Sequence, residues 1–236
     1  MYRLRLRHLF AIGALGAVPA ALGGCADNDS ALFIRSVIAL KAGDCLARAQ
    51  PDATMLAYGV LDTSFGRSYV ASLLVGNQMA RQGDRDKVRT ETSRIALRGA
   101  IVSVRDAFGN VIKEFTTDGA GFVDPGNGTE PGYGIMFAEL IPADLIAVDP
   151  GAGSTRVNVS VRVFGETLGG QDIESSELIF PIAVCNGCLV SIPPDAIGAT
   201  NRCTEGVPPD DLPCLRGQDS PVDCRLCSDN AACLPP

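Results

Sequence analysis

Seven of the nine cysteines lie between positions 185 and 233, and this concentration constrains the fold of the chain more than any other feature. The stretch 194–236 is also rich in proline and holds few large apolar side chains. A segment of this composition cannot fill a core of its own, so covalent crosslinks must order it. We therefore expect residues 194–236 to form a cysteine- and proline-rich tail that is stapled onto a larger folded unit.

The first 24 residues have the pattern of an export signal. Arg3, Arg5 and Arg7 precede an apolar run over 9–22, and small residues follow it. As a helix this run would span about 21 Å, which is less than the roughly 30 Å hydrocarbon core of a bilayer. A signal peptide over residues 1–24 is therefore favoured over a permanent transmembrane helix.

The residues at the end of this segment, Leu22-Gly23-Gly24-Cys25, resemble the lipobox of bacterial lipoproteins. The resemblance is confined to the first 25 residues. It implies that Cys25 is lipidated and becomes the mature N-terminus, with residues 25–30 as the lipidated cysteine and a polar tether. Two or three acyl chains hold a protein firmly, whereas one binds only marginally. Because Ala26 and not Asp follows Cys25, the resemblance further implies sorting to the outer membrane. The alternative is an ordinary signal peptide with a chance cysteine.

Without Cys25, eight cysteines remain, and an exported chain is expected to join an even number of them in disulfides. They are Cys45, Cys185, Cys188, Cys203, Cys214, Cys224, Cys227 and Cys233. The sequence does not choose among the possible pairings. Since 139 residues separate Cys45 from Cys185, any intramolecular bond of Cys45 ties the start of the folded unit to its end.

Two CxxC pairs leave other interpretations of the cysteines open. The pair at 185 and 188 and the pair at 224 and 227 could together bind zinc. A redox-active CxxC is a third interpretation, but thioredoxin-like sites open a helix after a strand. Residues 189–194, Leu-Val-Ser-Ile-Pro-Pro, are instead typical of a turn and a strand.

Alternation of apolar and polar residues predicts strands over most of 31–193. In the clearest run, 156–164, four valines alternate with polar residues and so share one face of a half-buried strand. The pattern returns at 178–184, and we expect these two runs to be neighbouring strands joined by a glycine-rich loop. A change of phase at Gly99-Ala100 indicates a β-bulge. Further strands are predicted at 32–40, 54–61, 68–76, 101–105, 111–115 and 134–140.

One part of this strand region has a local resemblance. The run from Val102 to Ile112, followed by Thr116-Thr-Asp-Gly-Ala-Gly-Phe122, is similar to the strand–turn–strand of bacterial immunoglobulin-like domains. About nine short strands separated by turns also fit an antiparallel β-sandwich. We expect a mainly β fold, with an immunoglobulin-like sandwich domain over 31–193 and the tail over 194–236. A separate binding module is the alternative for the tail.

The composition limits the chemistry of the chain. Hydrophobic residues make up 46% of it, enough to bury a core, and the formal net charge is −7. From Cys25 onward, 17 basic residues stand against 27 acidic ones, which disfavours nucleic acid as a partner because phosphate binding needs a cationic face. His8, the single histidine, would be lost with the signal peptide, so the mature chain lacks every site that needs imidazole. We expect no enzyme; a hydrolase with two carboxylates is the remaining catalytic alternative.

The glycine-rich loop 118–130 is the best candidate for a ligand site. Asp118, Asp124, Asn127 and Glu130 could supply the oxygen ligands that Ca²⁺ prefers. The loop lacks the spacing of an EF-hand, and acidic glycine-rich loops also occur as ordinary solvated turns.

Together these features predict a lipid-anchored protein of the bacterial outer membrane with a structural or interaction role and no cofactor. Its expected partners are the membrane, through the anchor, and a protein of the cell envelope. An adhesin- or ligand-binding module that uses loops of the sandwich, with or without Ca²⁺, is the alternative.

Overall fold

The structure is a computed structural model that describes residues 31–41, 43–84, 86–197, 203, 212–227 and 229–233. These residues form twelve strands and three short 3-10 helices, and no α-helix occurs among them. The mainly β fold predicted from the sequence is therefore confirmed. Within the same residues, no helix has the length and hydropathy needed to cross a bilayer. The predictions for Cys25, for the signal peptide and for the tether fall outside the described residues.

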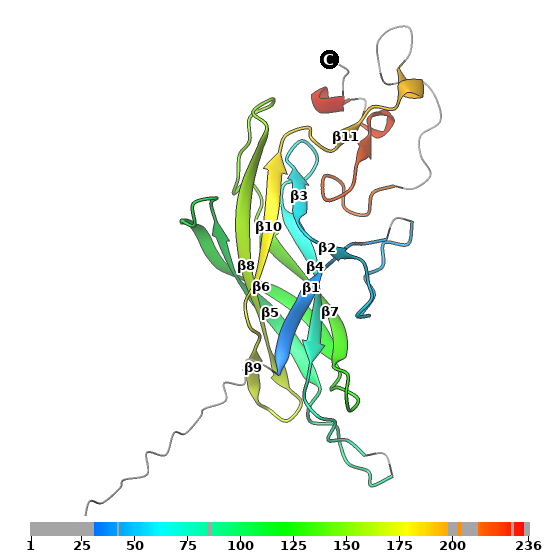
Figure 1. Ribbon diagram of the computed structural model, residues 1–236, viewed down its shortest axis with the longest axis vertical. Helices are drawn as coiled ribbons and strands as arrows, with labels where there is room; N and C mark the ends of the chain where they lie inside the picture. The colour runs from blue at the N-terminus through cyan, green and yellow to red at the C-terminus, as the bar shows by residue number, and fades with distance from the viewer. Residues whose placement is uncertain are drawn as a thin grey trace, which may run out of the picture.

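The first sheet has four antiparallel strands in the order β2-β1-β4-β7 (Figure 1). They are β1 (Leu32–Ile38), β2 (Met55–Leu56), β4 (Tyr69–Asn77) and β7 (Gly132–Ile141). β1 pairs only with the second half of β4, from Leu73 to Asn77. The first half of β4 therefore has one backbone edge that needs partners from elsewhere in the chain.

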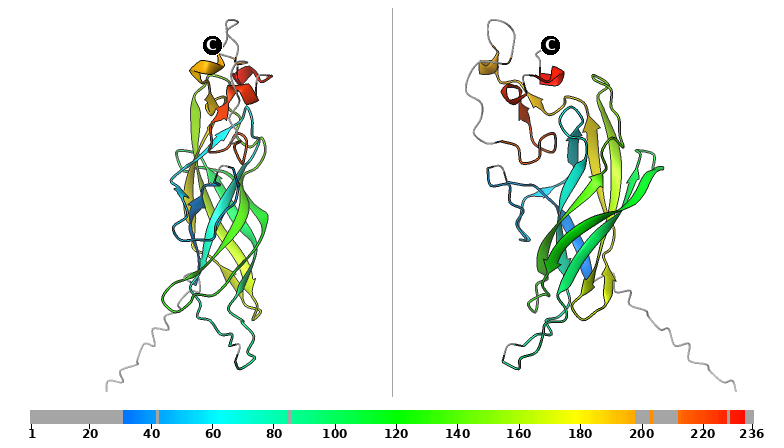
Figure 2. Two further views of the ribbon diagram at one scale, coloured as in Figure 1. Left: turned by 90° about the vertical axis from the view of Figure 1, so that its right-hand side faces the viewer. Right: turned by 180° about the vertical axis from the view of Figure 1, so that it is seen from behind.

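The second sheet is curled and has the strand order β3-β10-β8-β5-β6, with β9 added to β8 (Figure 2). Its strands are β3 (Gly59–Asp62), β5 (Ile95–Arg105), β6 (Val111–Val123), β8 (Ser154–Thr167), β9 (Asp172–Glu174) and β10 (Leu178–Cys185). β8 and β10 are the antiparallel neighbours that the sequence predicts. β3 is parallel to β10, so this sheet is mixed and not purely antiparallel.

The hydrophobic core lies between the two sheets. Val157, Val159, Val161 and Val163 of β8 are all buried in it, as their alternation with polar residues predicts. They share the core with buried side chains of the first sheet, such as Leu73. Each buried side chain of this size stabilises the fold by about 1.5–3 kcal/mol relative to an exposed one.

The bulge predicted at Gly99 is present in β5. The pairing of β5 with both of its neighbours changes register between Leu97 and Gly99. A Cβ atom at Gly99 would lie 2.5 Å from the backbone oxygen of Thr117 and 2.8 Å from the ring of Phe164. Glycine is therefore required here because two neighbouring elements approach the backbone closely.

Two parts of the strand prediction are wrong. The predicted single strand 54–61 is divided into β2 and β3, which belong to different sheets, because the chain crosses between the sheets at 57–58. The first part of the loop predicted over 118–130 is instead strand, because β6 continues to Val123. Its glycines allow close packing: a Cβ at Gly119 would lie 2.6 Å from the sulfur of Met136, and one at Gly121 would lie 2.7 Å from the oxygen of Ile135.

The described part of the tail forms a small second core together with the residues just before it. β11 (Val190–Ser191) pairs in parallel with β12 (Val222–Asp223), and short 3-10 helices span Pro194–Ala196, Cys224–Leu226 and Ala231–Cys233. Four cysteines dominate this core, and a few apolar side chains pack against them. Its members are Ala196, Cys203, Val222, Cys224, Cys227 and Cys233, with Phe65, Val190 and Ile192 beside them.

The described part of the tail and the start of β1 lie at opposite ends of the molecule (Figures 1 and 2). Leu32 pairs with Asn77, and the loop segments 78–84, 86–94 and 124–131 project beyond these residues. β10 runs the other way and reaches the tail at Cys185. We call these two ends the N-terminal end and the tail end.

Candidate functional site at the tail end

The eight cysteines beyond Cys25 form four disulfides, so the predicted disulfide bonding is present. The bonds are Cys45–Cys214, Cys185–Cys188, Cys203–Cys224 and Cys227–Cys233. The first joins the loop after β1 to the tail across a sequence separation of 169 residues. The other three lie within the tail or directly before it.

The two CxxC pairs are not joined to each other. Cys185 and Cys188 bond each other, whereas Cys224 bonds Cys203 and Cys227 bonds Cys233. Among the described residues, two groups bring a carboxylate and two sulfurs within 4.8 Å of one another: Asp62 with Cys185 and Cys188, and Asp223 with Cys203 and Cys224. The sulfurs of both groups are used in disulfides in this structure, which is the arrangement of a crosslink and not of a zinc site.

The predicted calcium ligands are placed separately. Asp118 lies in β6 opposite Gly99, and the Asp124 carboxylate pairs with the Arg94 guanidinium at 3.2 Å. Asn127 and Glu130 belong to one turn, in which the Asn127 amide donates to the Glu130 oxygen at 3.0 Å. In the part of the chain that the structure describes, the three carboxylates do not form a cluster within 4.8 Å. The calcium site stays a prediction.

Residues 217–219 of the tail close the open edge of the second sheet, and we call them the clasp. They run antiparallel to β3, with Gln218 opposite Leu61. The Asp62 amide donates to the Gly217 oxygen at 2.8 Å. The tail therefore acts as an additional edge segment and supplies partners for backbone groups that β3 would otherwise expose.

The Gln218 side chain of the clasp reaches across to the first sheet. Its Oε1 accepts a hydrogen bond from the Val70 amide at 3.0 Å, and its Nε2 donates to the Val70 oxygen at 2.6 Å. Val70 lies in the half of β4 that β1 leaves uncovered. One side chain thus supplies both missing backbone partners and joins the two sheets.

Asp219 completes the clasp with a carboxylate that is largely enclosed. Its Oδ1 accepts from the Val60 amide at 2.7 Å, and its Oδ2 accepts from the Tyr69 hydroxyl at 2.8 Å. Burial raises the pKa of Asp219 above its usual range, although the hydrogen bonds partly oppose this shift. The pKa of Tyr69 is also raised, by burial and then by the neighbouring carboxylate.

The loop that contains Cys185 and Cys188 is organised by the Asp62 carboxylate, which is completely buried. Asp62 Oδ1 accepts from the amides of Gly187 at 2.7 Å and Ser64 at 3.0 Å, and Oδ2 accepts from the Leu189 amide at 2.8 Å. Three backbone donors therefore fix this carboxylate between the turn after β3 and the CxxC loop. Such hydrogen bonds compensate for the cost of burying a polar group.

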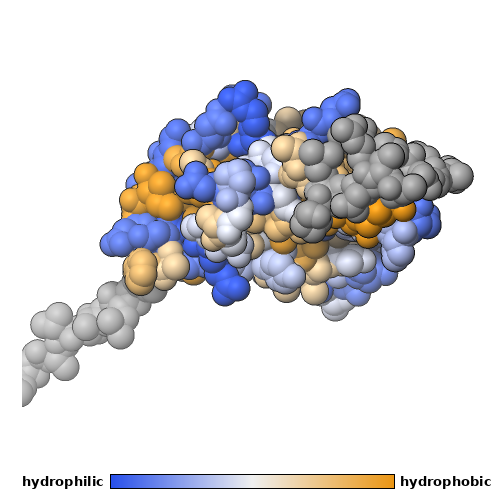
Figure 3. All heavy atoms as spheres, turned by 90° about the horizontal axis from the view of Figure 1, so that it is seen from above, coloured by the Kyte–Doolittle hydropathy of each residue, from blue (hydrophilic) through white to orange (hydrophobic). Residues whose placement is uncertain are grey.

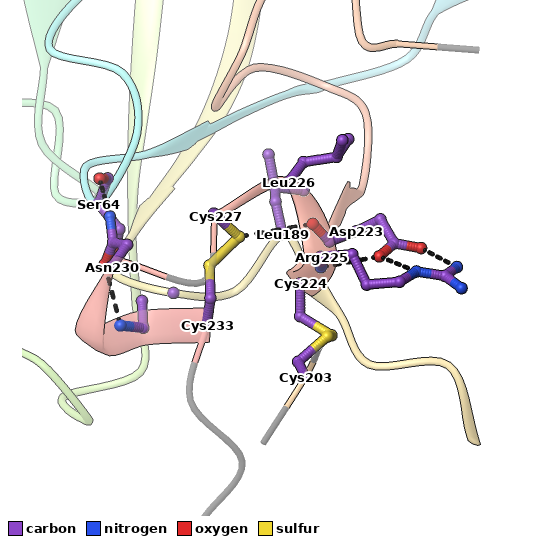
Figure 4. The surroundings of a disulfide bond; sticks show 12 residues. Ser64, Leu189, Cys203, Asp223, Cys224, Arg225, Leu226, Cys227, Asn230 and Cys233 are labelled. Carbon is purple, nitrogen blue, oxygen red and sulfur yellow. Dashed lines mark hydrogen bonds and ion pairs between the residues drawn. A yellow bond between two sulfur atoms is a disulfide. The ribbon is translucent and has the colours of Figure 1, made fainter. Parts of the chain in front are cut away.

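Polar contacts hold the end of the tail in place (Figure 4). Asn230 Nδ2 donates to the Ser64 oxygen at 2.9 Å, next to the Cys227–Cys233 bond. The guanidinium of Arg225 forms a two-point pair with Asp223, with Nε–Oδ1 and Nη2–Oδ2 distances of 2.9 and 2.6 Å. The pair is shielded from solvent and lowers the pKa of Asp223. The tail is thus a docked part of the molecule.

Sequence reasoning missed the polar residues that organise this end. In the sequence, nothing distinguishes Asp62, Gln218 and Asp219 from residues of ordinary turns. Tyr69 likewise resembles an ordinary core residue. Their partners lie far away in the sequence; 150 residues separate Tyr69 from Asp219. The available signal was the number of cysteines. It indicates that disulfides join the tail to the main β domain, but it does not show at which residues.

The surface at the tail end is mixed in character. Viewed toward that end, groups of apolar side chains are separated by polar ones (Figure 3). Comparison of the chain with family models, with curated proteins and with solved structures gives no match. The feature of this end that bears on function is its geometry: disulfides and a polar network connect the described part of the tail to both sheets.

Proposed function

We propose that this chain is a lipid-anchored protein of the bacterial cell envelope with a structural or interaction role, and that its tail end contacts a protein partner. The placement of the tail opposite the start of β1 carries the proposal. Cys25 precedes Ala31 by six residues, a tether of at most about 20 Å when extended. A lipid on Cys25 would hold the N-terminal end near the membrane, and the tail end would then face away from it.

The proposal includes an immunoglobulin-like sandwich over residues 31–193. Two sheets around one core and the antiparallel pairs of β8 with β5 and β10 support this assignment. The parallel pair of β3 and β10 is the element that a purely antiparallel sandwich lacks.

We further propose that the role is non-catalytic and needs no cofactor. The absence of histidine after His8 supports this. The acidic balance favours a protein over a nucleic acid as partner. Residue Ala26 supports the outer membrane as the location.

Lipidation is tested by feeding cells an alkyne-labelled fatty acid and comparing the natural chain with Cys25→Ala and with Asn28→Ala. We expect label and membrane association in the natural chain and in Asn28→Ala, because the tether residue does not carry lipid. The Cys25→Ala variant should lose both. Retention of the label by Cys25→Ala, or its absence from the natural chain, would contradict the proposal.

The orientation is tested by site-specific photo-crosslinking in intact cells. A photoreactive residue at the exposed position Ala231 lies at the tail end, and one at the exposed position Lys87 lies at the N-terminal end. We expect a defined protein adduct from position 231 and none from position 87. An adduct formed from position 87 alone would show that the N-terminal end, and not the tail end, is the contact surface.

A further inference from the structure

The Cys185–Cys188 disulfide differs from the other three in what it connects. It spans three positions at the end of β10, so it fastens no distant segments together. Cys45–Cys214 ties the tail to the loop after β1, and the other two bonds build the buried core of the tail. Because the entropic effect of a crosslink grows with the loop it closes, this bond contributes least to holding the fold.

The two cysteines joined by this bond are unequally exposed. Cys185 ends β10 and is 1% exposed, whereas Cys188 lies on the surface. Thiol–disulfide exchange requires in-line approach of a thiolate to one sulfur, and access decides which sulfur is attacked. An external thiolate can therefore reach Cys188, and the pair of electrons from the broken bond goes to Cys185.

The loop between the two cysteines is held by contacts that do not involve the sulfur–sulfur bond. Asp62 accepts from the amides of Gly187 and Leu189. Asn186 accepts from the Ser64 hydroxyl at 2.8 Å and donates to the Val148 oxygen at 3.2 Å. None of these contacts uses a sulfur atom, so opening the disulfide removes none of them, and the two thiols can stay close enough to close again.

We propose that Cys185–Cys188 is a thiol–disulfide exchange site that takes two electrons from a dithiol. A thiolate of the dithiol attacks Cys188 Sγ, the Cys185–Cys188 bond breaks, and Cys185 Sγ leaves and takes up a proton. The second thiolate of the dithiol then attacks the other sulfur of the same dithiol, which is bonded to Cys188. Cys188 Sγ leaves and takes up a proton. The dithiol becomes a disulfide and the protein gains two thiols. The buried Asp62 carboxylate lies within 4.8 Å of both sulfurs, at the end of β3, which packs against this loop.

The first test uses the natural protein and needs no substitution. Native protein is equilibrated with graded dithiothreitol, trapped with N-ethylmaleimide and mapped by peptide mass spectrometry. We expect Cys185 and Cys188 to become labelled as a pair while Cys203–Cys224 and Cys227–Cys233 stay closed and the near-ultraviolet circular dichroism stays native. Oxidised dithiothreitol should close the bond again. Labelling of this pair only together with loss of the native signal would overturn the proposal.

Two matched variants test the inequality of the sulfurs. Cys185→Ser leaves Cys188 as a thiol, and Cys188→Ser leaves Cys185. With oxidised glutathione, Cys188 should form a mixed disulfide at least about tenfold faster than Cys185, because access limits the attack. Equal rates, or faster reaction at Cys185, would show that Cys188 is not the exchanging sulfur. The control for folding is that both variants keep the native circular dichroism. If either variant does not fold, the dithiothreitol experiment on the natural protein decides the proposal.

Discussion

Asp219 places a carboxylate between the two sheets, where its charge is poorly solvated. Burial raises its pKa above the ordinary value of 3.8, so the folded protein holds this proton more tightly than the unfolded chain does. The stabilisation from protonated Asp219 is fully present below about pH 4 and is lost as the pH rises through the raised value. Acidification should therefore strengthen the docking of the clasp.

We predict that the free energy of unfolding of Asp219→Asn, minus that of the natural chain, increases as the pH rises from about 3.5 to about 7.5. The amide has no charge to lose, and its oxygen can still accept from the Val60 amide. Urea unfolding across this range measures the difference. The exposed Asp229→Asn serves as the control and should change stability by less than about 0.5 kcal/mol. A difference that does not vary with pH would refute the role of the Asp219 charge.

Asp62 satisfies three backbone donors, and we predict that Asp62→Ala lowers the free energy of unfolding by about 3 kcal/mol. The loss has this size because three part-buried amides are left without an acceptor. Asp84 is a matched control, since it accepts from the amides of Asp86 and Lys87 in an exposed loop. Asp84→Ala should cost less than about 1 kcal/mol because water replaces its oxygen. If chemical denaturation showed the same loss in the free energy of unfolding for both variants, the role of Asp62 as a buried acceptor would be contradicted.

The bulge in β5 depends on Gly99, where neighbouring elements approach the backbone closely. Gly99→Ala should destabilise the protein by about 1–3 kcal/mol, because the new methyl group meets the Thr117 oxygen and the Phe164 ring. Gly169→Ala is the control: its Cβ would make only ordinary contacts at 3.4 Å or more. Thermal unfolding should show a lower midpoint for Gly99→Ala alone. An unchanged midpoint would mean that the sheet adjusts without strain.

The strands were predictable from the sequence where one face is buried and the other is solvated. The four valines of β8 and the phase change at Gly99 are local signals, and the structure agrees with both. The second half of β6 was missed because its glycines resemble a turn while they serve close packing against β7. The parallel pairing of β3 with β10 leaves no local signal, since it joins Asp62 to Cys185 across more than half of the chain.

At the scale of the whole molecule, the bond between Cys45 and Cys214 connects the loop after β1 to the tail. Double substitution to serine should lower the free energy of unfolding by about 5 kcal/mol, because the bond closes a loop of 169 residues. The same change at Cys227 and Cys233, which lie six positions apart, should cost about 2 kcal/mol. Guanidinium unfolding of the two variants compares them. A larger loss from the short bond would show that loop length does not govern stability here.

The clasp also has a consequence for the order in which the molecule is completed. Synthesis begins at the N-terminus, so β3 and β4 exist long before residues 217–219 that cover them. During that interval Cys45 meets Cys185 and Cys188 before its final partner, Cys214, is made. A bond of Cys45 with either of these cysteines would leave Cys214 without its partner, so the native pairing of Cys45 cannot form until residue 214 is present.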